Sequence, residues 1–181
     1  MDLTEIGLLE TEKEDGIESF QTFEENALAK GRYFFHASGL PTMADDSGLV
    51  VRALAGRPGV HSKRWSGRSD LFGQELDDEN NRLLLESLAG ARDRAAAYVC
   101  AAAYVDSARE VVTRGEVVGE ITDSARGSNG FGYDPHFLST DLGVTFGEAS
   151  LRDKEEVSHR GRAFRALLER LRAERSAVGG S

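Results

Sequence analysis

The sequence predicts an α/β fold in which one mixed β-sheet is flanked by helices. Two observations predict it. Residues 94–122 contain two alternating segments typical of a β-hairpin, and three other segments have helical periodicity with start or stop signals. These helical segments are residues 22–39, 76–90 and 158–174. With 181 residues, 40% of them hydrophobic, the chain suits one domain. We expect that domain at residues 1–175 and a disordered tail at 176–181.

The first predicted helix spans residues 22–39. Thr22 and Glu25 form a capping-box pattern at its start, and Gly39 followed by Pro41 ends it. Polar or amphipathic side chains at helical spacing share one face, namely Asn26, Lys30 and Tyr33. The other side of the helix is apolar enough to face a core.

A strand interrupted at residues 45–48 is predicted for residues 42–54, and a helix ending at Gly90 for residues 76–90. Between them lies a loop rich in turn-forming residues, 55–70. This loop contains the only basic cluster in the sequence, which we interpret as solvated: Arg57, His61, Lys63, Arg64 and Arg68.

The hairpin and the last helix complete the predicted order. Alanine-rich residues 94–106 are compatible with a helix, but their alternation and the β-branched partner at 110–122 favour a strand. In the last helix Ser158 is the expected N-cap. The expected buried stripe is Ala163, Phe164, Leu167, Leu168 and Leu171.

Composition excludes several function classes. The net charge of −9 argues against a nucleic-acid or anionic-membrane partner, because such partners require a broad basic face. No apolar run approaches the ~20 residues of a membrane span. The acidic N-terminus lacks signal-peptide features, and Cys100 is the only cysteine, which excludes a disulfide framework. We therefore expect a cytoplasmic protein.

Asp45 and Asp46 are adjacent within the stretch MADDSGLVV, residues 43–51. Two interpretations are open. The pair can form an Asx-type turn, in which the carboxylates accept local backbone N–H groups. It can also form an oxygen-only Mg²⁺ site completed by a third carboxylate from Glu18, Glu24 or Glu25.

Residues 127–137, GSNGFGYDPHF, form the second candidate site. Its glycines allow the backbone to approach a ligand closely, and an exposed aromatic ring there can stack on a flat group. The alternative is a wide loop whose aromatic side chains pack inward. Both interpretations are open from the residues alone.

The stretch KEEVSHR, residues 154–160, is the third candidate site. With Ser158 as N-cap, His159 and Arg160 lie in the first helical turn, where the helix dipole disfavours cations unless an anion or acceptor is near. A ligand site and a solvated helix end are both compatible with this pattern. Cys100 lies in an apolar alternating segment and is expected in the core, and the histidines lack zinc-ligand spacing.

Together these segments resemble the inosine triphosphate pyrophosphatase family, the dITP/XTP pyrophosphatases. Six stretches match in family order: TFEENALAKG, ADDSGLVVRALAGRPGVHSKRWSG, RAAAYVC, GFGYDPHF, TFGEAS and KEEVSHRGRAF. The resemblance covers residues 18–171 and implies an ITPase-like (Maf/Ham-type) fold. It also implies a homodimer that hydrolyses non-standard purine nucleoside triphosphates (ITP, dITP, XTP) with Mg²⁺, giving the monophosphate and pyrophosphate.

The resemblance implies roles for individual residues. The metal ligands would be Glu18, Asp45 and Asp46, and the catalytic residues Asp46, as general base, and Lys30, which meets the phosphates. The substrate-binding residues would be Ser47, Phe131, Gly132, Tyr133, Asp134, Lys154, His159 and Arg160. Among these, the Phe131 ring would stack on the purine, while His159 and Arg160 would lie near its 6-oxo group and reject adenine.

One departure concerns the N-terminus. Family members begin with a strand and a phosphate-binding turn of the form T/S-x-x-N-x-x-K, and neither precedes MDLTEIGLLE. We therefore expect the first βα unit to be missing. The alternative function is an inactive or regulatory nucleotide-binding relative that retains the base pocket. A phosphatase for another nucleotide, or a septum-inhibitor-type pyrophosphatase, is disfavoured by the SHR and GFGYDP motifs.

Overall fold

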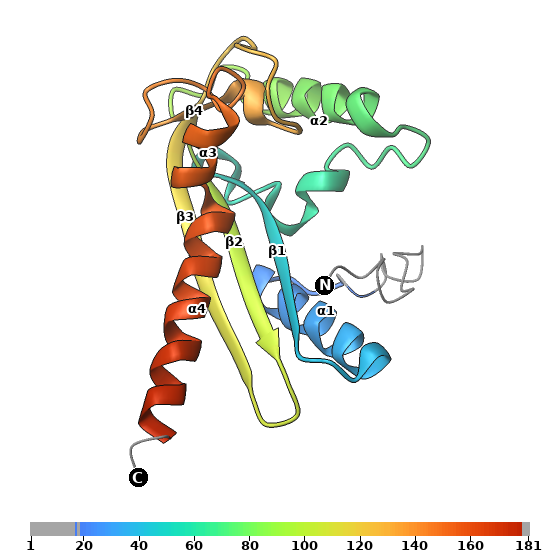
Figure 1. The fold of residues 1–181 in the computed structure, drawn as a ribbon. Coiled ribbons are helices and arrows are strands. Elements are labelled where there is room, and N and C mark those ends of the chain that lie inside the picture. The colour runs from blue at the N-terminus through green and yellow to red at the C-terminus, as the bar shows by residue number, and fades with distance from the viewer. Residues whose placement is uncertain (1–16, 18, 179–181) are drawn as a thin grey trace.

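The computed structural model describes residues 17 and 19–178. Its centre is a four-stranded sheet in the order β1-β2-β3-β4, and every pair of neighbouring strands is antiparallel. The strands are β1 (Thr42–Val51), β2 (Ala95–Val105), β3 (Glu110–Ile121) and β4 (Phe137–Ser139). Figure 1 shows that the first three are long and run side by side.

Helices cover both faces of this sheet. Helix α1 (Phe23–Ser38) packs on one face and α4 (His159–Val178) on the other (Figure 1). At one end of the sheet lie α2 (Gly73–Ser87) and α3 (Leu151–Val157). Three short 3₁₀ helices complete the described part: η2 (Arg52–Leu54), η3 (Gly59–Arg64) and η4 (Asp134–His136).

The predicted α/β fold with flanking helices is confirmed, and two details of its sheet differ. Within the described strands no parallel pairing occurs, so the sheet there is antiparallel rather than mixed. The predicted interruption at residues 45–48 was wrong. Asp45 and Asp46 pair with Ala102 and Ala101, so β1 is continuous through the acids.

The position of β2 between two helices explains why this strand is rich in alanine. Successive strand residues point to opposite faces. Val99 and Ala101 belong to the core under α1, whereas Cys100 and Ala102 belong to the core under α4. Because small alanine side chains let both helices approach the strand closely, the central strand is alanine-rich despite the helix preference of alanine.

Local signals predicted the two long helices well. The Thr22 side chain accepts a hydrogen bond from the Glu25 N–H at 3.2 Å, and Gly39 has the left-handed φ of 69° that ends α1. The Ser158 side chain likewise accepts the Gly161 N–H at 3.0 Å, as a cap of α4. Of the predicted stripe on α4, Leu168 was wrong, since it is 41% exposed.

The other helices were predicted less well. Helix α2 begins at Gly73 and ends at Ser87, a few residues before the predicted bounds of 76–90, and α3 was not predicted. Helix α4 runs to Val178, so part of the expected tail is helical, while residues 179–181 lie outside the described part. The domain boundaries and the missing first βα unit stay predictions.

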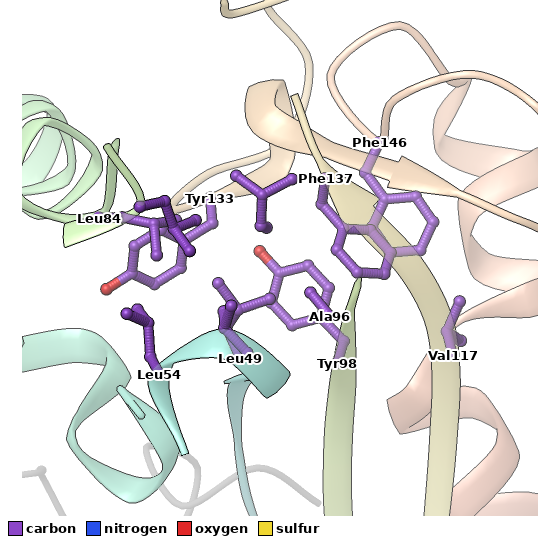
Figure 2. Close-up of a cluster of buried hydrophobic side chains, with 12 residues drawn as sticks. Leu49, Leu54, Leu84, Ala96, Tyr98, Val117, Tyr133, Phe137 and Phe146 are labelled. Atoms are coloured by element: carbon purple, nitrogen blue, oxygen red, sulfur yellow. The ribbon is translucent and has the colours of Figure 1, made fainter. Parts of the chain in front are cut away.

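The largest core cluster lies at the α2 end of the sheet. Figure 2 shows the rings of Tyr98, Phe137 and Phe146 close together, with Leu49 of β1 beside Tyr98 and Leu84 of α2 beside Tyr133. Tyr98 and Phe137 have ring centroids 4.7 Å apart. This aromatic core packs against the end of the sheet at which the candidate site lies. Among the described helices, none combines the length and apolarity that a membrane span requires.

Candidate active site

A cavity of about 450 Å³ is lined by residues of β1, β2, η3, α2, the segment 131–134, α3 and the start of α4. It is lined by all eight residues that the sequence predicted to bind substrate, which come from three separate segments of the chain: Ser47, Phe131, Gly132, Tyr133, Asp134, Lys154, His159 and Arg160. A volume of this size is typical of small-molecule sites. The second and third sequence candidates therefore line one cavity, together with Ser47, the residue that follows the acidic pair.

The wall of the cavity contributed by α4 is positioned by a glycine. A Cβ atom on Gly115 of β3 would lie 2.2 Å from the His159 carbonyl oxygen and 2.4 Å from the Ala163 nitrogen. Only glycine permits this approach, which places the start of α4 against the sheet. There the His159 ring stacks on Tyr98, with centroids 4.9 Å apart and planes within 11°.

His159 is a neutral group in this site. Burial lowers its pKa to about 3, and the nearby cations Arg160 and Lys154 add to the effect. Its Nδ1 is buried and has no hydrogen-bond partner among the residues that the structure describes. Buried polar atoms are normally hydrogen-bonded, so this nitrogen is an exception among the described residues.

Residues 127–137, the aromatic loop, contribute another wall. The Phe131 side chain is 73% exposed, whereas Tyr133 and Asp134 are buried. The Asp134 carboxylate accepts the Phe131 N–H at 2.9 Å and forms an ion pair with Lys154. The Lys154 ammonium also lies 5.1 Å from the centre of the Phe131 ring, which is a cation–π distance. The loop therefore presents one exposed ring on a fixed backbone.

Asp45 and Asp46 lie on opposite faces of the sheet, as adjacent strand residues must. Asp46 is buried on the α1 side, where its carboxylate accepts the Asn26 amide at 2.9 Å and the Ser47 N–H at 3.0 Å. Asp45 faces α4, where its carboxylate pairs with Arg160 at 2.9 Å. Neither acid is among the residues that line the cavity.

Lys30 lies beside this acidic pair. Its ammonium donates to the Asp45 backbone carbonyl at 3.0 Å, so the predicted helix face of Asn26 and Lys30 meets β1 at the two acids. The Asx turn is therefore not formed, and the role of the acids as metal ligands stays a prediction. The acids continue the strand and point away from each other.

The residues fit Mg²⁺ only as a partial ligand set. Within residues 17 and 19–178 no group of three or more acidic, histidine or cysteine side chains is placed to hold a metal. Glu18 lies outside the described residues. Glu24 pairs with Arg114, and Glu25 bonds to Thr22. Protein sites for Mg²⁺ often supply only one or two carboxylates and rely on substrate phosphates for the remaining ligands. This site can provide such a small number of carboxylates.

Three other features of the sequence have clear positions. Cys100 is buried, and burial raises the pKa of its thiol to about 12, so it is a core residue as predicted. In residues 55–70, the basic loop, Lys63 lines the cavity, whereas the sequence interpretation treated the whole basic cluster as solvated. His136 is buried with a lowered pKa caused by burial, apart from the cavity.

Sequence reasoning missed several residues of the cavity. Tyr98 of β2 stacks on His159, and the Tyr133 hydroxyl donates to the Ser62 carbonyl at 2.8 Å. Polar residues of α2 also reach the site, among them Asp77 and Asn80. The signal was present, because these polar side chains share a helix face with buried Leu84 where apolar residues are expected.

Comparisons with known proteins agree with this geometry. The chain is 46% identical to the dITP/XTP pyrophosphatase of Ralstonia nicotianae over 171 residues, covering 93% of this chain and 82% of that protein. It is 51% identical to the dITP/XTP pyrophosphatase of Mycobacterium bovis over 154 residues, covering 84% and 73%.

A solved structure gives the same result for the fold. The Ham1 protein of Staphylococcus aureus matches with a TM-score of 0.82 and 36% identity, over 95% of this chain and 85% of that one. The sequence model of the Ham1 family matches residues 2–170. The chain therefore belongs to the Ham1 family.

Proposed function

We propose that this protein is a dITP/XTP pyrophosphatase, which hydrolyses ITP, dITP and XTP to the monophosphate and pyrophosphate and so removes non-standard purines from the nucleotide pool. The observation that supports it most is the single cavity lined by all eight residues expected to bind the nucleotide. The activity named for the Ralstonia and Mycobacterium relatives is the second support.

The base end of the site would be formed by Phe131, His159 and Arg160. The exposed Phe131 ring offers a surface on which a purine can stack. His159, neutral at pH 7, and Arg160 offer hydrogen-bond donors for a 6-oxo group. Adenine has an amino donor at that position, so binding adenine would leave donors unpaired, which is how polar sites discriminate strongly.

The phosphate end would be formed by Lys30, Lys154 and the acids of β1. The two ammonium groups would neutralise phosphate oxygens, and positioning with charge neutralisation is most of what phosphoryl transfer requires. Asp46 would take a proton from the attacking water. Of the three metal ligands that the resemblance implies, Asp45 faces α4, so Asp46, on the α1 side, would hold Mg²⁺ together with Glu18. When bound, the ion neutralises phosphate charge and orients the leaving group.

Product analysis tests the proposal. Incubation of the protein with ITP and Mg²⁺, followed by ³¹P NMR, is expected to show inosine monophosphate and pyrophosphate in equal amounts. Asp46→Asn should lower kcat at least about a hundredfold. Asp78→Asn is the matched control, because Asp78 is an exposed acid of α2 outside the cavity, and it should leave the rate unchanged.

Other products would contradict the proposal. Inosine diphosphate and inorganic phosphate would indicate a phosphatase. Binding of ITP without any hydrolysis would support the regulatory relative that the sequence left open. We also infer a cytoplasmic homodimer from the family resemblance. Sedimentation equilibrium should give twice the 19.7 kDa chain mass, and a monomer at all concentrations would contradict that inference.

A further inference from the structure

Helix α2 presents a polar face to the cavity. Asp77, Asn80 and Asn81 lie at spacings i, i+3 and i+4, on the same face as fully buried Leu84. Figure 2 shows Leu84 beside Tyr133 of the aromatic loop, so this face packs directly against that loop. Polar side chains at such positions cost free energy unless they are hydrogen-bonded.

Two of them bind both backbone groups of one glycine. The Asp77 carboxylate accepts the Gly132 N–H at 2.7 Å, and the Asn81 amide donates to the Gly132 carbonyl at 2.8 Å. Gly132 has a φ of 61°, and a glycine there has wide conformational freedom unless its backbone is held. We call this pair of contacts the Gly132 clamp.

The third polar residue holds the opposite wall. The Asn80 side chain accepts the Ser66 N–H at 2.8 Å and donates to the Lys63 carbonyl at 3.1 Å. Lys63 lines the cavity, and the neighbouring Ser62 carbonyl receives the Tyr133 hydroxyl. Helix α2 therefore joins the basic loop and the aromatic loop on either side of the same cavity.

The Gly132 clamp matters because the neighbouring residue, Phe131, is largely exposed. Phe131 is 73% exposed, so little side-chain packing fixes the plane of its ring. Its orientation depends on the backbone at residues 131–132, which is held by Asp134 on one side and by the clamp on the other. A base that stacks on Phe131 gains most when the ring is already oriented.

We infer that Asp77 and Asn81 are positioning residues that orient Phe131 for base recognition, an inference that rests on the proposed function. Asp77 lines the cavity, so its loss could also act directly on a ligand, whereas Asn81 is outside the lining. An effect of Asn81 on nucleotide binding is therefore indirect, and its hydrogen bond to the Gly132 carbonyl is the route that the test below examines. This difference makes Asn81 the sharper probe.

The test measures the Kd for inosine 5′-monophosphate, which contains the base and is not consumed, together with turnover of ITP. Asn81→Ala and Asp77→Ala should each raise the Kd about tenfold, the size expected for losing a buried hydrogen bond. Asp77→Asn keeps an acceptor and should restore most of the affinity. Asp78→Ala, the adjacent exposed acid bonded to Gln74, is the matched control and should leave the Kd unchanged.

A double-mutant cycle with Phe131→Ala separates positioning from general stability. If the clamp acts through the ring, Asn81→Ala should change the Kd less than about twofold once Phe131 is gone. Equal losses in both backgrounds would overturn the inference, as would an unchanged Kd in Asn81→Ala. Should that variant unfold, the same cycle with Asp77→Ala and Asp77→Asn decides the question.

The same data separate this inference from the proposed function. Wild-type protein that binds the monophosphate but does not hydrolyse ITP would overturn the function and leave the clamp to be judged by its variants. Hydrolysis of ITP with no effect of either clamp variant would overturn only the clamp. Absence of both binding and hydrolysis would overturn both.

Discussion

At the scale of single residues, the two adjacent acids of β1 face different helices. Asp46 is buried against α1 with neutral donors on both oxygens, and Asp45 meets Arg160 on the α4 side. The backbone alternation of a strand forces this division. Lys30 and Arg160 therefore contact the same strand from opposite faces of the sheet.

Asp46→Asn should destabilise the protein as well as lower its activity. Asn26 and the Ser47 N–H each donate to a different Asp46 oxygen, and an amide offers only one acceptor. One buried donor is then unpaired, which costs about 1–3 kcal/mol of unfolding free energy. Urea denaturation measures this. Asp45→Asn, at a less buried position, should lower the unfolding free energy less. An Asp46→Asn variant as stable as wild type would contradict the hydrogen bonds described for Asp46.

His159 should make stability depend on pH. Its folded pKa of about 3 lies below the unfolded value of 6.5, so the unfolded state binds more protons between them. Stability contributed by neutral His159 is complete above pH 6.5 and is lost as the pH falls toward 3. His159→Phe keeps a ring to stack on Tyr98. Denaturation from pH 4 to 8 should show a shallower acid limb in this variant; an identical limb would refute the assignment.

At the scale of elements, the close packing of α4 against Gly115 of β3 positions the start of that helix. Gly115→Ala would place a methyl group 2.2 Å from the His159 carbonyl oxygen, so α4 must shift. Overpacking of this kind costs about 1–3 kcal/mol, and displacement of His159 should also raise the KM for ITP. Glu116→Ala, at the exposed neighbouring position, is the control. Unchanged stability and KM in Gly115→Ala would contradict the close packing.

Elements governed by local signals could be predicted from the sequence. The caps at Thr22, Gly39 and Ser158 and the alternation of β2 and β3 depend only on neighbouring residues. Helix α3 and the polar face of α2 could not be predicted in the same way. That face is polar because its partners, the backbones of the basic and aromatic loops, are far away in the sequence.

At the scale of the whole molecule, the cavity joins residues from β1, the aromatic loop, α3 and α4. Spacing within the chain contains no information on such long-range contacts, so the residues alone left each motif with two interpretations. The family resemblance grouped the eight residues, and the structure places them in one cavity. The family resemblance could not indicate that α2 holds two walls of that cavity, because the side chains of α2 bind backbone groups of those walls.

Removal of Mg²⁺ should abolish activity without unfolding the protein. The Asp46 carboxylate already accepts hydrogen bonds on both oxygens, and Asp45 pairs with Arg160, so the fold does not depend on a metal to satisfy them. Structural metal sites behave differently, because their apo proteins unfold. Thermal melting in EDTA should match melting in Mg²⁺ within about 2 °C. A large loss of thermal stability in EDTA would assign the metal a structural role.

The central claim is that the site selects purine triphosphates by the group at position 6 of the base. The most direct measurement is kcat/KM for ITP, XTP and ATP under one set of conditions with Mg²⁺. The account predicts values for ITP or XTP at least about a hundredfold above the value for ATP, because adenine leaves donors of His159 or Arg160 unpaired. Equal values for ITP and ATP, or no turnover of any of them, would contradict it.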